Sequence, residues 1–170
     1  MLDPMVARTI RDLDADVISI KAGINIVNAD TMRERALVPA VHGFLDTIRD
    51  GHPTTPIALV TPIICPVAED HPGPTVLGRD ERFHVVARSN ELSTGALSLC
   101  RVRSLFGDVV AARRAEGDIN LHLIDGLVLF GPDDVGDLPD GLHPNADGYR
   151  RIGERFHDLM FGDGGPFGQH

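Results

Sequence analysis

Short continuous apolar runs alternate in this chain with longer stretches whose apolar residues recur at helical spacing. The short runs predict strands, and the first of them is apolar enough to be buried on both faces, as strands of parallel sheets are. The strands are expected at residues 16–22, 57–61 and 120–124. The helices are expected at residues 3–13, 31–50, 93–117 and 144–161. This alternation predicts an α/β protein with a parallel sheet, helices on both faces and right-handed crossovers.

Loops and chain ends complete the expected architecture. Residues 1–161 are expected to form a single domain, and the Gly-rich residues 162–170 a flexible tail. Residues 23–30 are expected to be a loop after the first strand. Residues 62–90 contain several prolines and are expected to form a long irregular segment, which serves as a lid or as a wall of a substrate pocket.

Composition and charge argue against several classes of function. The chain has 42% hydrophobic and 24% charged residues, which is typical of a globular protein rather than a disordered one. A net charge of −9 argues against nucleic acid or an anionic membrane surface as a partner. No apolar run approaches the ~18 residues of a membrane span, and the first residues show no signal peptide, so a cytoplasmic location is predicted. Cys65 and Cys100 are expected to be buried free thiols, with a disulfide or a catalytic cysteine as alternatives.

Asp140 and His143 stand three positions apart in a loop that runs into the last predicted helix. A carboxylate beside an imidazole fixes the tautomer of the ring and stabilises the imidazolium, while the second ring nitrogen removes a proton from a hydroxyl group. The pair is therefore the candidate general base of a nucleophilic mechanism. The alternative is a surface loop in which the aspartate only caps the helix.

The place of this pair in the expected fold strengthens the candidate. In parallel α/β sheets, functional groups lie beyond the carboxyl ends of the strands. The loop after the first strand carries Asn25, the loop after the second begins at Pro62, and the loop after the third carries the Asp140–His143 pair. Three loops from distant parts of the sequence are thus expected to meet at one edge of the sheet.

Two clusters of potential metal ligands are weaker candidates. Four aspartates crowd the loop before His143, but they lack the Asp-x-Asp-x-Asp-Gly spacing of a calcium loop, so a solvated acidic loop is the preferred interpretation. They are Asp133, Asp134, Asp137 and Asp140. Glu69, Asp70 and His71 follow Cys65 closely, but no pair among them has the spacing of a zinc site. Neither a metal nor an organic cofactor is expected.

Two of these segments resemble sequence blocks of the GDSL-type SGNH hydrolases, a family of serine esterases and acylhydrolases with a flavodoxin-like, three-layer α/β/α fold. The family's last block is Asp-x-x-His before the final helix, and here it is Asp140-Gly141-Leu142-His143, extended by Pro144-Asn145-Ala146-Asp147-Gly148-Tyr149. The third block is Gly-x-Asn after a buried strand, and here it is Gly23-Ile24-Asn25. The resemblance extends from Asp3 to Phe161.

The resemblance implies roles for three residues. His143 is the general base and later the acid to the leaving group, Asp140 orients it, and the Asn25 amide donates to the oxyanion of the tetrahedral intermediate. Asn28 is a competing donor, although only Asn25 fits the Gly-x-Asn block. The implied reaction is hydrolysis or transfer of an acyl group of a small-molecule ester, and nothing in the residues selects one ester.

One part of the family pattern is missing from the sequence. Family members carry the nucleophilic serine in a Gly-Asp-Ser block after their first strand, and a further block supplies a glycine whose N–H completes the oxyanion hole. This chain contains no Gly-Asp-Ser. It therefore resembles the C-terminal portion of the fold with the last three strands, and the serine is expected upstream of Met1. None of the resident serines is expected in a tight strand-to-helix turn. They are Ser19, Ser89, Ser93, Ser98 and Ser104.

Two hypotheses about function follow. In the first, the chain is the base and oxyanion half of a serine esterase, and whether it is an enzyme by itself stays open. In the second, it is a non-catalytic α/β module, or an inactive fragment, that needs a partner to complete its sheet. The strand at residues 16–22 would then be an exposed apolar edge, and such edges pair with other chains, a second copy of the same chain included.

Overall fold

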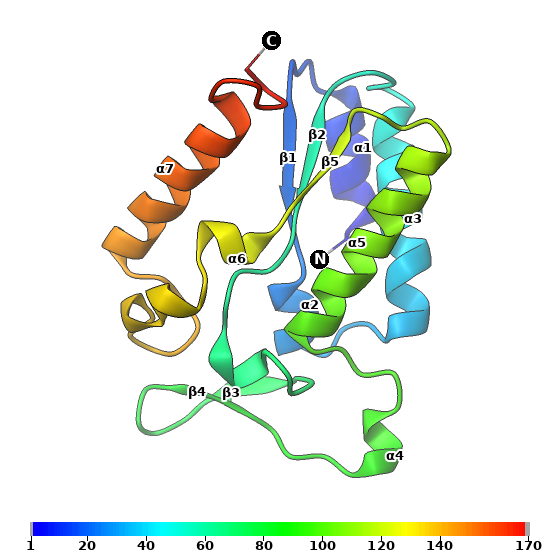
Figure 1. The fold of residues 1–170 in the computed structure, drawn as a ribbon. Helices are drawn as coiled ribbons and strands as arrows, with labels where there is room; N and C mark the ends of the chain where they lie inside the picture. The colour runs from blue at the N-terminus through cyan, green and yellow to red at the C-terminus, as the bar shows by residue number, and fades with distance from the viewer. Residues whose placement is uncertain (1, 169–170) are drawn as a thin grey trace.

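A three-stranded parallel sheet forms the centre of the molecule in the computed structural model, which describes residues 2–168 (Figure 1). Its strands are β1 (Ile18–Lys21), β2 (Ile57–Val60) and β5 (Leu121–Ile124), in the order β1-β2-β5. The register places Ile18 beside Ile57 and Ile57 beside Leu121. All three strands therefore end together, and the loops that follow them meet at one edge of the sheet.

Helices cover both faces of this sheet, as the order of elements predicted. One face carries α1 (Pro4–Asp12), α3 (Glu34–Arg49) and α5 (Leu99–Ala115), and the other carries α6 (Gly126–Leu129) and α7 (Ala146–Phe161) (Figure 1). Side chains of β2 alternate between two hydrophobic clusters: Ile57 and Leu59 face the first three helices, while Ala58 and Val60 face α7. The predicted α/β fold with three layers is thus confirmed.

Strand β1 differs from the prediction that it is buried on both faces. Ile18 and Ile20 are buried in the cluster under α1 and α3, whereas Ser19 and Lys21 are exposed. The reason is its place at the margin of the sheet, where α7 covers only part of the second face. β2 lies between two strands and is buried along its whole length.

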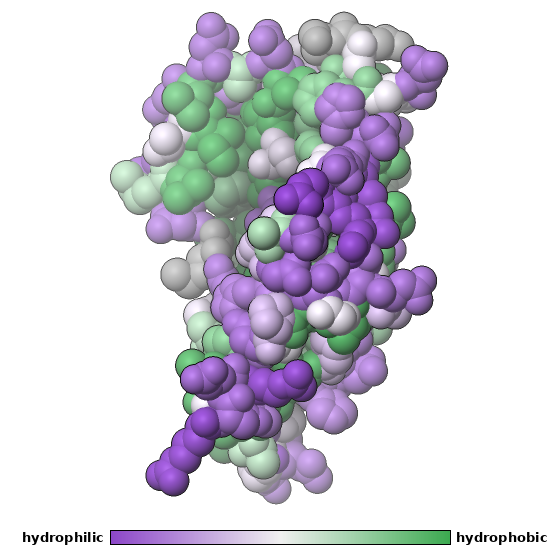
Figure 2. All heavy atoms as spheres, turned by 90° about the vertical axis from the view of Figure 1, so that its left-hand side faces the viewer, coloured by the Kyte–Doolittle hydropathy of each residue, from purple (hydrophilic) through white to green (hydrophobic). Residues whose placement is uncertain are grey.

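The outer edge of β1 is open within the part of the chain that the structure describes. Ile18 and Ala22 donate backbone hydrogen bonds to Pro56 and Val60, so the alternate residues of the strand direct their backbone groups away from β2. Figure 2 views the molecule from the side of α7 and shows a hydrophobic area beside a polar one. An unpaired strand edge favours pairing with a further strand.

The long segment expected to be irregular contains regular structure. It includes a 3-10 turn, η1 (Pro66–Ala68), the antiparallel hairpin β3 (Thr75–Leu77) with β4 (Phe83–Val85), and the short helix α4 (Asn90–Ser93). The strands are three residues long, too short for a pattern of alternation to identify them. Figure 1 shows the hairpin beyond the carboxyl ends of the sheet strands, where the sequence predicted a pocket wall.

Several helix boundaries also differ from expectation. The loop expected at residues 23–30 contains the short helix α2 (Ile24–Asn28), and the loop before α7 contains η2 (Pro132–Asp137). Helix α5 begins after Ser98, whose hydroxyl accepts a hydrogen bond from the Arg101 N–H, so the helix predicted at residues 93–117 starts too early. Pro39 lies inside α3 without dividing it. The helices predicted at both ends of the chain are confirmed: Asp3 caps α1 and Asn145 caps α7.

The segment after α7 packs against the protein up to residue 168. Phe167 is only 2% exposed, and its ring lies edge-on to Phe156 and Phe161, at centroid distances of 6.4 and 5.5 Å. The glycine content predicted a flexible tail here, but one aromatic side chain anchors the segment on α7. Residues 169–170 of the predicted tail lie outside the described residues. Among the described helices, none is long and apolar enough to cross a membrane.

Candidate active site

Asp140 and His143 form a hydrogen-bonded pair at the carboxyl edge of the sheet. The His143 Nδ1 lies 2.7 Å from the Asp140 Oδ2, and the backbone N–H groups of Leu142 and His143 donate to the other carboxylate oxygen at 2.9 and 2.7 Å. With its proton on Nδ1, the ring keeps Nε2 free to accept a proton. The His143 side chain is 61% exposed, so this nitrogen is accessible to a ligand.

The charge of Asp140 is stabilised by these contacts. Burial by itself raises the pKa of this carboxyl, but the hydrogen bonds from the His143 backbone, the His143 ring and the Leu142 backbone outweigh burial and lower the pKa to about 2. The carboxylate is therefore ionised at neutral pH. An ionised partner favours the protonated imidazole that a general base becomes during the reaction.

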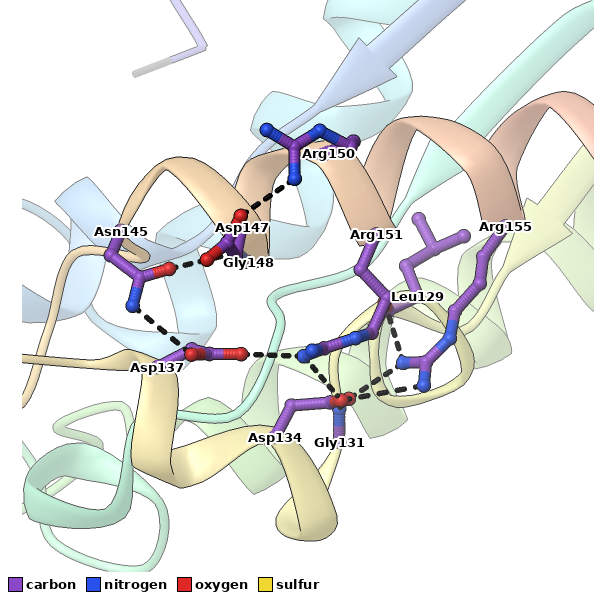
Figure 3. A network of polar contacts seen from close by, with 10 residues as sticks. All are labelled: Leu129, Gly131, Asp134, Asp137, Asn145, Asp147, Gly148, Arg150, Arg151 and Arg155. Atoms are coloured by element: carbon purple, nitrogen blue, oxygen red, sulfur yellow. Dashed lines mark hydrogen bonds and ion pairs between the residues drawn. The ribbon is translucent and has the colours of Figure 1, made fainter.

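A network of hydrogen bonds and ion pairs joins the two ends of the loop that carries Asp140 and His143 (Figure 3). Asn145 donates to Asp137 twice, from its backbone N–H to the carbonyl at 2.8 Å and from Nδ2 to the carboxylate at 3.0 Å. Arg151 of α7 donates to Asp137 at 2.6 Å and to Asp134 at 3.0 Å, and Arg155 donates to Asp134 at 2.6 Å. Residues 138–144 are thus held at both ends against α7.

Three further contacts, from two residues outside the loop, fix its middle. The Phe83 N–H in β4 donates to the Asp140 carbonyl at 3.0 Å, and the Phe83 ring lies edge-on to the His143 imidazole at a centroid distance of 5.6 Å. The Cys65 thiol donates to the Gly141 carbonyl at 3.4 Å. Burial raises the pKa of the Cys65 thiol, so this group is a buried contact and not a reactive thiolate. Cys100 is exposed, contrary to the prediction that both thiols are buried.

Asn25 lies in α2, which begins at the carboxyl end of β1. Gly23 precedes this helix with a φ of 119°, and a Cβ at this position would lie 2.5 Å from the Pro62 ring. Only glycine fits such a close approach at a positive φ. The Gly-x-Asn segment therefore turns sharply from the strand into the helix, and Asn25 is exposed at this turn.

One cavity of about 460 Å³ brings the candidate residues together. Asn25, Asn28 and His143 all line it, so the structure places the predicted base and both candidate amide donors at one hollow. The Oδ1 atom of Asn28 is buried without a hydrogen-bond partner, whereas Asn25 is exposed. The remaining lining residues are mainly apolar. They are Lys21, Ile24, Ile63, Cys65, Leu142, Pro144, Tyr149 and Ile152.

Two aspartates of the acidic cluster before His143 are not solvated as the sequence suggested, whereas Asp133 of the same cluster is exposed. Asp134 is only 7% exposed and accepts hydrogen bonds from both Arg155 and Arg151, while Asp137 accepts from Arg151 and Asn145. The Arg155 hydrogen bond is the main reason why the pKa of Asp134 lies below its ordinary value. In the other cluster of potential metal ligands, formed by Glu69, Asp70 and His71, Glu69 forms an ion pair with Arg103 of α5. The carboxylates of Asp134, Asp137 and Glu69 are thus engaged by guanidinium groups.

Three residues of the site escaped the sequence analysis. Lys21 was treated only as part of a strand, Phe83 as part of an irregular segment, and Arg151 as part of the last helix. Lys21 is the only lysine in the sequence, which is a signal that composition alone could have revealed. Phe83 and Arg151 reach the loop through tertiary packing and carry no local signal.

The fold of this chain is similar to the folds of several solved structures. No family model matches the chain, and no curated protein matches its sequence. Among solved structures, the salicylyl-acyltransferase SsfX3 of a tetracycline biosynthetic pathway is similar over 96% of this chain and 42% of its own, with 28% identity and a TM-score of 0.75. A structure titled as a GDSL-like lipase from Bacteroides ovatus matches 94% of this chain and 39% of its own, with 21% identity and a TM-score of 0.64.

A carbohydrate esterase of family 3 from Talaromyces cellulolyticus extends the similarity. It matches 90% of this chain and 63% of its own, with 15% identity and a TM-score of 0.56. The chain thus spans about two fifths of the first two neighbours. An acyltransferase, a lipase and an esterase share one arrangement of sheet and helices with it. The resemblance in the sequence blocks is confirmed at the level of structure: this chain has the SGNH hydrolase fold.

Proposed function

We propose that this chain carries the base and oxyanion half of a serine esterase or acyltransferase of the SGNH class. The observation that carries the proposal is the hydrogen bond between Asp140 and His143, together with the cavity that His143 lines with Asn25. The fold shared with an acyltransferase and an esterase supports the same class of reaction. The substrate is a small-molecule ester.

The proposed reaction assigns one task to each of these groups. His143 Nε2 takes the proton of a serine hydroxyl as its oxygen attacks the ester carbonyl carbon, and Asp140 stabilises the resulting imidazolium. The Asn25 amide donates to the oxyanion, where the charge develops in the transition state. His143 then gives the proton to the departing alkoxide, which leaves an acyl-serine. Water or an acceptor alcohol, deprotonated by the same histidine, removes the acyl group.

The nucleophilic serine is proposed to come from a segment outside these 170 residues. The sequence holds no Gly-Asp-Ser block, and its resident serines occupy other positions. Ser19 lies on β1, Ser93 lies in α4, and Ser98 caps α5. The open edge of β1 offers a place for a further strand, because its outward backbone groups lack a partner in the described part of the chain.

Fluorophosphonate labelling tests this proposal. The chain as written, and the same chain preceded by the residues that its gene encodes upstream, are treated with the reagent, and any adduct is mapped by peptide mass spectrometry. We expect no serine adduct on the first and one adduct on the second, lost in the His143→Ala variant. His84→Ala is the matched control, since His84 also pairs with an aspartate, Asp80, at 2.9 Å on the hairpin. A His143-dependent adduct on a resident serine would refute the missing nucleophile.

A non-catalytic module is the second candidate, and the open edge of β1 favours it. In this case the edge pairs with another chain, such as a second copy, and the sheet extends across the contact. Light scattering on the purified chain distinguishes the two candidates. A stable dimer that dissociates in the Ser19→Pro variant would support the module. A monomer that is labelled by the fluorophosphonate only when the upstream segment is present would support the enzyme. The cytoplasmic location stays a prediction.

A further inference from the structure

Lys21 is the only lysine in the chain, and the rest of its 16 lysine and arginine residues are arginines. It is the last residue of β1, on the face of the strand opposite to the buried Ile18 and Ile20, and it lines the cavity that contains Asn25 and His143. A lysine carries its charge as a compact, strongly hydrated ammonium group. Such a group on a cavity wall forms charge-assisted hydrogen bonds with an anion that enters the cavity.

No protein partner for this ammonium is found within residues 2–168. Hydrogen bonds or ion pairs engage most of the arginines, but none involves the Lys21 side chain. Protein atoms around the concave wall displace water from the ammonium, and this desolvation lowers the pKa of Lys21 although its side chain is reachable from solvent. An anion bound beside it would restore the lost solvation.

The residues around the cavity fit an anion at this point. Among the described residues that line it, none is an aspartate or a glutamate, although the whole chain has a net charge of −9. The side chains of Ile24, Ile63, Tyr149 and Ile152 supply an apolar wall. The cavity volume of about 460 Å³ lies within the range of pockets that hold whole small ligands, roughly 300–1,000 Å³.

We propose that Lys21 binds a second, anionic group of the substrate, so that the site prefers esters whose acyl part carries a carboxylate at the end of a short aliphatic chain. The ester carbonyl lies at His143 and Asn25, the aliphatic chain lies on the isoleucine side chains, and the remote carboxylate lies at Lys21. This assignment rests on the proposed function, because it takes the cavity as the ester site.

Two probe esters of nearly equal shape test the assignment on the chain as it exists. Monomethyl glutarate carries a remote carboxylate, and methyl pentanoate carries a methyl group in its place. Protein labelled with ¹³C at lysine Cε gives a single lysine signal, because Lys21 is the only one, and ¹⁵N labels report on the Asn25 amide. Titrations at low salt yield both dissociation constants from the same spectra.

We expect monomethyl glutarate to bind about tenfold more tightly than methyl pentanoate and to move the lysine signal. Lys21→Met should remove this preference, Lys21→Arg should keep most of it, and Arg8→Met, which removes an exposed charge on α1, should leave it unchanged. Equal binding of the two esters at the cavity, or a preference that survives Lys21→Met, would overturn the role of Lys21 and leave the proposed function standing. If neither ester shifts the NMR signals of Asn25 or His143, both the role of Lys21 and the proposed function are overturned.

Discussion

Replacing Asp140 with asparagine removes one charge from the candidate base while the shape of the side chain stays the same. In the native chain this carboxylate accepts three hydrogen bonds, two from backbone N–H groups and one from the His143 ring. The asparagine oxygen can still accept the backbone bonds, but it accepts them as a neutral group. Any loss of stability therefore measures how strongly the loop favours the charge.

The size of this loss follows from the pKa of Asp140. Its lowering from the ordinary 3.8 to about 2 corresponds to a stabilisation of about 2.5 kcal/mol at neutral pH, and partial exposure of the carboxylate reduces the expected effect to about 2 kcal/mol. Because this pKa is lower in the folded than in the unfolded chain, the stabilisation is complete well above pH 4 and disappears as the pH falls through about 2. About half of it should remain at pH 3.

Urea unfolding of the native chain and of Asp140→Asn, followed by circular dichroism at pH 7 and at pH 3, measures the effect. We expect the variant to be less stable by about 2 kcal/mol at pH 7 and by about 1 kcal/mol at pH 3, because protonation of Asp140 at low pH removes the charge that distinguishes the two side chains. Asp147→Asn, at an exposed position in the first turn of α7, is the matched control and should change stability little. Equal stability at pH 7, or a difference that does not narrow at pH 3, would refute the reasoning.

Three other perturbations give clear expectations. Gly23→Ala should lower the free energy of unfolding by about 3 kcal/mol, because its Cβ would lie 2.5 Å from a proline ring carbon. Gly141→Ala should lower it by only about 1 kcal/mol, because this glycine has a positive φ but open space around it. Equal losses of stability for the two variants in urea unfolding would contradict this expectation. Asp134→Ala should cost about 3 kcal/mol in the same assay, because it leaves two guanidinium groups without their buried partner, and an unchanged midpoint would speak against the ion-pair network. Cys100 should react quickly with a thiol reagent in the native protein and Cys65 only after unfolding, so two fast thiols would disprove the burial of the second.

The sequence predicted those parts of the fold that depend on local chemistry. Strands β2 and β5 and the helices at the two ends of the chain lie where the apolar pattern indicated them. The pairing of Asp140 with His143 was also predictable, because the two residues are three positions apart in one loop and their side chains can meet. Their role in catalysis stays a proposal.

Features that depend on distant parts of the chain were not predictable in the same way. The burial of Asp134 requires Arg151 and Arg155 of α7, and no local pattern in the sequence links these arginines to that aspartate. The exposed face of β1 depends on its place at the edge of the sheet, which the apolar run could not indicate. The hairpin residue Phe83 contacts the base loop only because residues 62–90 fold back across the carboxyl ends of the strands.

The closure of residues 138–144 between Asp137 and Asn145 has a consequence for how such a protein can diversify. An insertion or deletion inside this loop changes the distance between its ends and breaks the two hydrogen bonds that join them. The tip of the β3–β4 hairpin, around Gly78 and Glu81, is exposed and closes on itself through a single turn. Changes in length are therefore tolerated at the hairpin and not at the base loop. Related sequences are expected to vary in the wall of the cavity while the geometry of the histidine stays constant.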